Sequence, residues 1–135
     1  MAADADSRRL YVLTSDENFQ ETAVAVIDTG TGTEVAAVPL DDDVHFGISV
    51  SGDGRRVYIP NLYLSTVSIL DTQTNAAVGS PVSMDGIPLS LAVSPDSSRV
   101  YVTLSGGEGR IAVFKAADPH SVTTITLRAG RDPAG

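Results

Sequence analysis

The sequence predicts an all-β fold built from repeated four-stranded antiparallel sheets. Three observations support this prediction. Two phrases recur along the 135 residues at a fixed spacing, which indicates structural repeats. Short segments such as RVYI, TVSIL and VTTITL alternate apolar and polar residues with period two, as half-buried strands do. Turn-forming motifs separate these segments. No segment shows apolar residues at helical spacing over the length of a helix.

The first repeated phrase contains a turn followed by a strand. SVSGDGRRVYI (Ser49–Ile59) aligns with AVSPDSSRVYV (Ala92–Val102) at an offset of 43 residues, and ADADSRRLYV at the start of the chain is a third copy. The second phrase contains a strand followed by a turn. AVIDTGTGTEVAAV (Ala25–Val38) aligns with SILDTQTNAAVGSP (Ser68–Pro81) at the same offset, and its third copy carries Lys115 where an aspartate is expected.

Each repeat is expected to hold four short strands joined by hairpins. In the middle repeat these strands are predicted at Phe46–Val50, Arg55–Ile59, Thr66–Leu70 and Ala77–Val82. Four antiparallel strands in a period of roughly 40 to 50 residues describe one blade of a β-propeller. The chain is therefore predicted to be a partial propeller of about three blades, with one four-stranded sheet in each.

The predicted blades lie at about 1–42, 43–86 and 87–129 of a single domain. Only three residues precede the first turn, so the first blade is expected to lack its inner strand. The tail, 130–135, ends in PAG, which corresponds to the start of the third blade's inner strand. We interpret this tail as the lead-in to a fourth blade, which makes the chain a window on a longer array.

The repeated motifs resemble the YVTN-type β-propeller repeat. The resemblance lies in VSPDSSRVYVT (Val93–Thr103), VSILDTQTN (Val67–Asn75) and GIP (Gly86–Pro88), although the tetrapeptide itself reads YVLT, YIPN and YVTL. This family implies a disc of blades, commonly seven, often in exported or cell-surface proteins of bacteria and archaea. It is also related to propellers that carry lactonase or redox chemistry. An extracytoplasmic or surface location is thus what the resemblance implies.

Composition narrows the function classes. The net charge of −8 disfavours nucleic acid as a partner, and the lack of cysteine excludes disulfides, thiolate metal sites and cysteine nucleophiles. No apolar run is long enough to span a membrane, and no export signal is visible. We expect a non-catalytic propeller module that serves as a binding or protein-interaction scaffold within a larger protein. The alternative is part of a propeller enzyme, such as a lactonase-like hydrolase, whose active site lies partly outside this sequence.

The polar residues of the repeats are interpreted as structural. Aspartate in a tight turn accepts hydrogen bonds from its own backbone. This role is predicted for Asp6, Asp28, Asp53, Asp71 and Asp96. Tyrosine in a strand offers a large apolar ring for packing between blades. This role is predicted for Tyr11, Tyr58 and Tyr101.

Two acidic loops are the candidate binding site. Both are expected on one side of the disc, where their like charges repel unless a cation or a basic partner neutralises them. Oxygen ligands suit calcium, and the predicted ligands are Asp16, Asp41, Asp42 and Asp43. A basic protein partner is the second interpretation, and the residues expected to contact it are Glu17, Glu21 and His45. Solvated loop charge is the third. No catalytic residue is predicted.

The two ends of the array determine the expected assembly. Blades bury their faces on neighbouring blades, and here the outer faces of the first and third blades have no neighbour. The isolated chain is therefore expected to be marginal, prone to aggregation or oligomeric. Its expected partners are a protein, further propeller blades or a second copy.

His45 and His120 are expected on opposite sides of the disc, so no site combining them is predicted.

Overall fold

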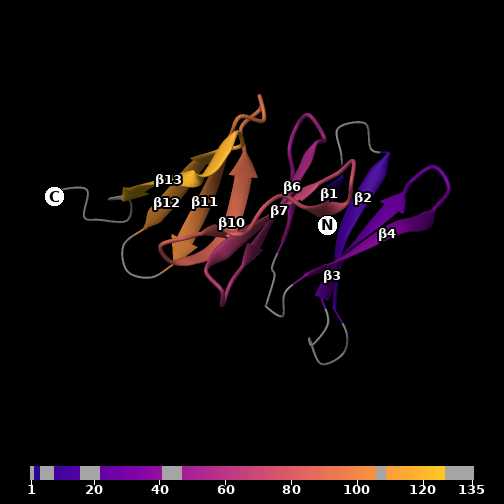
Figure 1. The fold of residues 1–135 in the computed structure, drawn as a ribbon, viewed down its shortest axis with the longest axis horizontal. Coiled ribbons are helices and arrows are strands. Elements are labelled where there is room, and N and C mark those ends of the chain that lie inside the picture. Colours follow the sequence, from indigo (N-terminus) through magenta and orange to yellow (C-terminus); the bar gives the residue numbers. More distant parts are fainter. Residues whose placement is uncertain (1, 4–7, 16–21, 41–46, 106–108, 127–135) are drawn as a thin grey trace, which may run out of the picture.

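The computed structural model describes residues 2–3, 8–15, 22–40, 47–105 and 109–126. Its regular elements in these residues are all β-strands, thirteen in number, and they form three antiparallel sheets (Figure 1). This confirms the predicted all-β fold with four-stranded sheets. In the described part of the chain no helix is long and apolar enough to cross a membrane.

The first sheet follows the chain order β1-β2-β3-β4. Its strands are β1 (Ala2–Ala3), β2 (Arg9–Ser15), β3 (Thr22–Asp28) and β4 (Thr33–Leu40). The expectation that this sheet lacks its inner strand is wrong, because β1 pairs with residues of β2. Antiparallel pairing uses backbone groups alone, so two residues are enough to begin the ladder.

The second sheet contains β5 (Ser49–Val50), β6 (Arg56–Asn61), β7 (Thr66–Asp71), β8 (Ala76–Ala77) and β9 (Val82–Ser83). The outer strand, predicted as one continuous segment, is broken into β8 and β9, and both pieces pair with β7. Gly79 interrupts it with a φ of 64°, which is a left-handed conformation. Pro81 then offers no backbone N–H to the ladder.

The third sheet has the order β10-β11-β12-β13 and the longest ladders. Its strands are β10 (Ile87–Val93), β11 (Arg99–Ser105), β12 (Arg110–Lys115) and β13 (Asp118–Thr126). A register shift interrupts the β10–β11 pairing between Pro88 and Ser90, where proline again removes a donor.

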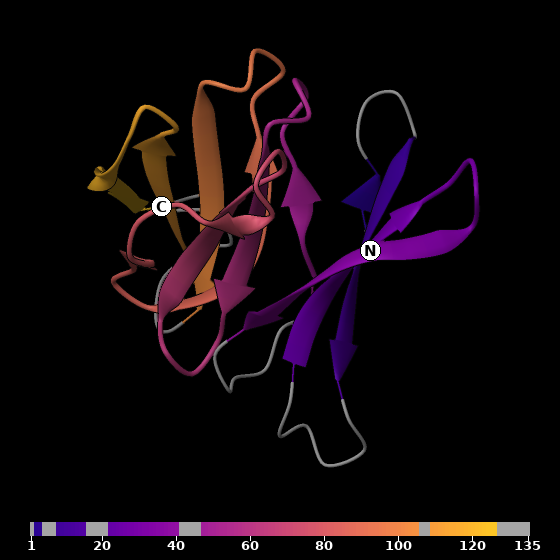
Figure 2. The same ribbon diagram turned by 45° about the vertical axis from the view of Figure 1, so that its right-hand side comes forward.

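The hydrophobic core lies between the sheets. The three sheets stand side by side with the second in the middle, as both views show (Figures 1 and 2). Strand side chains point alternately to the two faces of a sheet, so the middle sheet buries both of its faces while each outer sheet buries one. On β6 every residue from Val57 to Asn61 is buried, whereas β11 alternates buried and exposed residues.

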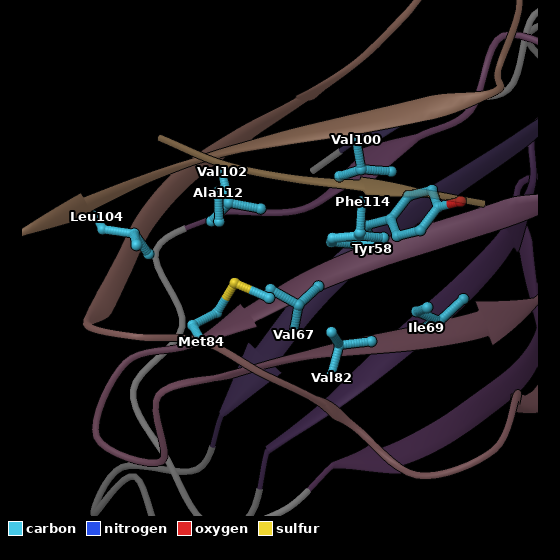
Figure 3. Close-up of a cluster of buried hydrophobic side chains, with 10 residues drawn as sticks. All are labelled: Tyr58, Val67, Ile69, Val82, Met84, Val100, Val102, Leu104, Ala112 and Phe114. Carbon is cyan, nitrogen blue, oxygen red and sulfur yellow. The ribbon is translucent and has the colours of Figure 1, made fainter. Parts of the chain in front are cut away.

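Two hydrophobic clusters fill the two spaces between sheets. The cluster between the first and second sheets consists of Tyr11, Val24, Val26, Val38, Ile48, Val57, Ile59 and Leu70. The cluster between the second and third sheets consists of Tyr58, Val67, Ile69, Val82, Met84, Val100, Val102, Leu104, Ala112 and Phe114 (Figure 3). The Tyr58 and Phe114 rings meet there with centroids 6.1 Å apart and planes tilted by 60°, a favourable aromatic arrangement.

A close backbone approach marks the connection from the second sheet to the third. Gly86 has a φ of 154°, and a Cβ at this position would lie 2.7 Å from Arg110 Nη2 and 3.2 Å from the Ser105 carbonyl oxygen. The Arg110 guanidinium also donates to Asp85 Oδ2 at 3.3 Å. Glycine therefore leaves room for an arginine that reaches back to the connection.

We expect Gly86→Ala to destabilise the chain by about 1–3 kcal/mol, because alanine crowds the Ser105 carbonyl oxygen and strains the backbone. Chemical denaturation followed by circular dichroism measures the change. Gly47→Ala is the matched control, since a Cβ there meets nothing within 4 Å, and its expected effect is within about 0.5 kcal/mol. Equal losses from the two variants would contradict this account of Gly86.

Candidate functional site

The acidic residues singled out in the sequence lie outside the described residues. The predicted calcium ligands Asp16, Asp41, Asp42 and Asp43 belong to segments 16–21 and 41–46, as do Glu17, Glu21 and His45. Their calcium or partner-binding role therefore stays a prediction. Within the residues that the structure does describe, no three His, Asp or Glu side chains come together as a metal site would require. His120 lies exposed near the start of β13.

The turns from inner strand to second strand form a repeated hydrogen-bond network. In the third sheet the Ser94 hydroxyl donates to Asp96 Oδ1 at 2.6 Å, and the Ser98 backbone N–H donates to the same oxygen at 3.0 Å. Ser94 Oγ in turn accepts the Arg99 backbone N–H at 3.0 Å. The same three bonds recur in the second sheet around Ser51 and Asp53. The predicted turn role of Asp53 and Asp96 is confirmed.

These donors change the acidity of both aspartates. The Ser94 and Ser98 hydroxyls and the Ser98 backbone N–H stabilise the charged carboxylate, which lowers the pKa of Asp96 to about 2. The Ser51 hydroxyl likewise lowers the pKa of Asp53 from its ordinary value. Both carboxylates are charged at neutral pH, and their Oδ1 atoms accept the hydrogen bonds of the turn. A proton shuttle needs a pKa near the working pH, so neither group suits that task.

The turns from third to fourth strand use aspartate in the same way. Asp28 Oδ1 accepts the backbone N–H groups of Gly30 and Thr31 at 2.8 and 3.2 Å. Asp71 Oδ1 likewise accepts the backbone N–H groups of Gln73 and Thr74. Asp71 Oδ2 also receives Arg56 Nη1 at 2.8 Å, an ion pair that joins the two turns of the second sheet. The bond from the Gln73 N–H is the main reason that the pKa of Asp71 is lowered. The predicted turn role of both aspartates is confirmed, while Asp6 lies outside the described residues.

The turns also connect neighbouring sheets. Arg9 Nη1 reaches from the first sheet to the Thr72 carbonyl oxygen of the second at 3.0 Å. The Asp53 backbone N–H donates to Ser97 Oγ of the third sheet at 3.0 Å. A Cβ on Gly52 would lie 3.2 Å from the Pro95 carbonyl oxygen, so the two turns touch. Hydrogen bonds at one edge of the sheets thus supplement the apolar packing between them.

The third sheet departs from this pattern at Lys115. In the register of β11 and β12, Lys115 stands opposite Arg99, where the second sheet has the ion pair of Arg56 with Asp71. Two cations therefore face each other, and among the described side chains neither takes part in an ion pair. Like charges opposite each other on a sheet are unfavourable unless an anion lies between them.

The third sheet has one side that faces away from the second sheet, which we call the forward face, and no other described sheet covers it. It is a shallow hollow of about 560 Å³. Its lining is Arg99, Tyr101, Val113, Phe114, Lys115, Asp118, Ser121, Thr123 and Ile125. Tyr101 is 38% exposed here, whereas Tyr11 and Tyr58 are 2% and 1% exposed at the corresponding positions. The predicted packing between sheets is confirmed for Tyr11 and Tyr58. It is wrong for Tyr101, because no sheet among the described residues covers it.

One polar cluster was not predicted from the sequence. Asn61, 1% exposed, ends β6, and its Nδ2 donates to Thr66 Oγ1 and to Ser68 Oγ, each at 2.9 Å. Its Oδ1 atom has no hydrogen-bond partner among the described residues. Asn61 is the last residue of the YIPN motif, and the other two copies of this motif end in Thr14 and Leu104. Because the residue type differs among the copies, the repeat did not indicate a role for this position.

Acidification tests the role of Asp96. Its lowered pKa means that folding favours the carboxylate, a contribution complete above about pH 4 and lost as the pH falls through about 2. We expect Asp96→Asn to lower the thermal midpoint at about pH 6 by a few degrees and to reduce the further loss on acidification to about pH 2.5. Asp118→Asn, at an exposed aspartate of the same sheet, is the control. Equal acid-induced losses in the wild type and Asp96→Asn would refute this role.

Comparison with known proteins bears on the fold. No family model matches the chain, and no curated protein sequence does so either. Many solved structures resemble it, and three of them are described next. Hydrazine synthase of Kuenenia stuttgartiensis matches with a TM-score of 0.79 and 21% identity, over 94% of this chain and 35% of that one. The dihydro-heme d1 dehydrogenase NirN, in a complex with DHE, matches with a TM-score of 0.74 and 25% identity, over 98% and 26%.

The tricorn protease matches with a TM-score of 0.66 and 12% identity, over 90% of this chain and 12% of that one. The chain therefore spans about a third or less of the length of each of these structures. The three matches are to propeller-type proteins. At this level of identity the likeness establishes the fold and not the activity. Together with three antiparallel sheets packed face to face, it shows that the chain consists of β-propeller blades.

Proposed function

We propose that this chain is a non-catalytic β-propeller module that binds protein through the open faces of its terminal blades. The observation that supports this proposal is the contrast among the three repeat tyrosines. Two are buried between blades, and the third, Tyr101, is 38% exposed beside Ile125, which is 47% exposed. A contiguous apolar face with a polar rim is a typical protein-binding surface on a soluble domain.

The chemistry of the turns supports a non-catalytic role. Asp28, Asp53, Asp71 and Asp96 each accept backbone or hydroxyl donors of their own turn, so these acids serve the fold. The alternative is part of a propeller enzyme such as a lactonase-like hydrolase. All three similar structures are named as enzymes, namely a synthase, a dehydrogenase and a protease. The loops 16–21 and 41–46 of this chain would have to contribute to such a site.

The wider setting is proposed on the family resemblance. The YVTN-like motifs favour a larger extracytoplasmic or cell-surface protein, in which this chain supplies about three blades. The acidic loops provide a second proposed contact on the same module. They would hold calcium through Asp16, Asp41, Asp42 and Asp43, or contact a basic partner through Glu17, Glu21 and His45.

Self-association in dilute neutral buffer tests the proposed function. We expect the average mass of the wild-type chain to rise above 14.0 kDa with concentration. Tyr101→Asp replaces the aromatic ring of the forward face by a short charged side chain and should weaken this association about tenfold or more, because the apolar contact of the ring is lost. Light scattering after size-exclusion chromatography measures both.

Tyr63→Asp is the matched control, because Tyr63 is 77% exposed in the loop between β6 and β7 and lies outside the forward face. It should associate as the wild type does. A wild-type chain that stays a dispersed 14.0 kDa monomer at all concentrations would show that the terminal blades need no partner, and the proposed function would then be wrong.

A further inference from the structure

We propose that, when this chain is on its own, the forward face of the third blade binds the first blade of a second copy, so that two copies close head-to-tail into a ring of six blades. Within a larger protein, a further blade would take the same place. This inference rests on the proposed function and specifies its partner. Its basis is a comparison of the two interfaces inside the chain with the two faces that remain open.

The two internal interfaces use the same positions on the forward side. In the first blade Tyr11 pairs with Val26, and Val24 pairs with Val38. In the second blade Tyr58 pairs with Ile69, and Val67 pairs with Val82. All eight side chains belong to the cores that these blades share with the blade that follows. A tyrosine and three aliphatic residues in fixed register thus form the forward half of each interface.

The third blade repeats this forward half. Tyr101 pairs with Val113, and Ile111 pairs with Ile125, in the same register. The chemistry of the four positions is also the same, with one tyrosine and three aliphatic side chains. Only their burial differs, because Tyr101 and Ile125 are exposed where their counterparts are buried. At these four positions the face therefore carries the side chains that the other two blades use to bind a blade.

The first blade carries the matching rear half of such an interface, on its side that faces away from the second blade. Val57 pairs with Leu70 in the second blade, and Val100 pairs with Phe114 in the third, and all four are buried against the preceding blade. Leu10 pairs with Ile27 at the corresponding positions of the first blade, and these two side chains are only half-buried. Val12 lies two residues further along the same face and is also half-buried. The open rear face is thus apolar at the positions that a preceding blade would cover.

Charges at the turn edge favour the same pairing. Arg99 and Lys115 stand together on the third blade and form no ion pair with a described residue. At the internal interface Arg9, the counterpart of Arg99, reaches the Thr72 carbonyl oxygen in the turn that Asp71 begins. The corresponding turn of the first blade begins with Asp28, whose carboxylate forms no ion pair among the described residues. In the ring, Asp28 of one copy would lie beside the two cations of the other.

The number of blades favours a closed dimer over an open chain of copies. The contact joins two different surfaces, so it makes either a ring or a filament. With three blades in each copy, two copies bring the total to six, within the range of about four to eight blades found in propellers. The ring covers both terminal faces of both copies.

Two variants, each blocking one face, test the proposal. Ile125→Asp blocks the forward face and Val12→Asp blocks the rear face. The wild type should have twice the 14.0 kDa mass of the chain, and each variant alone should dissociate with a dimer constant raised about a hundredfold or more. An equimolar mixture of the two variants should regain dimers, because one interface between them is intact. Thr124→Asp, at the exposed residue next to Ile125, is the control and should stay dimeric.

Different failures have different meanings. If Ile125→Asp dissociates the chain but Val12→Asp does not, the proposed function stands and the first blade is not the partner. If the mixture of variants does not regain dimers, the head-to-tail arrangement is wrong. A wild-type monomer would overturn both this inference and the proposed function. Circular dichroism verifies that each variant keeps its β structure.

A charge exchange tests the same interface without altering the apolar faces. Asp28→Lys should weaken the dimer, and combining it with Lys115→Asp should restore most of the loss, because the pair would be reversed across the interface. Double-variant dimers no stronger than those of Asp28→Lys alone would contradict the placement of Asp28 beside Lys115, and with it the proposed ring.

Discussion

Face-to-face packing of neighbouring sheets is the interaction on which the rest of this structure depends. A single sheet has no interior, so its side chains are buried only where another sheet lies against them. Val57 and Tyr58 show this clearly, because adjacent residues of one strand are buried in two different cores. The middle blade is therefore apolar on both faces. Whether a residue of the repeat is buried depends on whether its blade has a neighbour on that side.

The turn aspartates have a complementary role. Sheets that slide past each other would misplace the apolar rows, and the bonds of the turns oppose such sliding at one edge. Asp53 illustrates the connection, since its carboxylate orders its own turn while its backbone N–H bonds Ser97 of the next blade. These residues recur because each interface needs the same local geometry. Their recurrence is thus a property of the fold, and it says little about a ligand.

The sequence predicted the elements that depend on local chemistry and on the repeat. The 43-residue offset and the period-two segments were enough for the blade, and Asp71 and Asp96 could be assigned to turns because backbone donors lie within a few residues of them. The break at Gly79 was missed, because a continuous outer strand was assumed from one apolar pattern. The exposure of Tyr101 was also missed, since burial there depends on a neighbouring blade that local pattern does not describe.

The candidate site was less predictable than the fold. The open forward face is invisible in the repeat itself, because Tyr101 and Ile125 have the same character as their buried counterparts. What distinguishes them is their place in the array. Lys115 was recognised as a departure from the repeat, yet its meaning required the register that sets it opposite Arg99. The role of the acidic loops is still a prediction from charge alone.

A double-mutant cycle between Tyr58 and Phe114 tests whether neighbouring blades share one core, because these two rings belong to different blades and meet in it. Tyr58→Leu, Phe114→Leu and the double variant would be unfolded by denaturant, and the free energies of unfolding compared. Packing between the sheets predicts a coupling of about 0.5–1.5 kcal/mol between the two rings. Losses that add to within about 0.3 kcal/mol would show that the blades do not share this core, and would contradict the account.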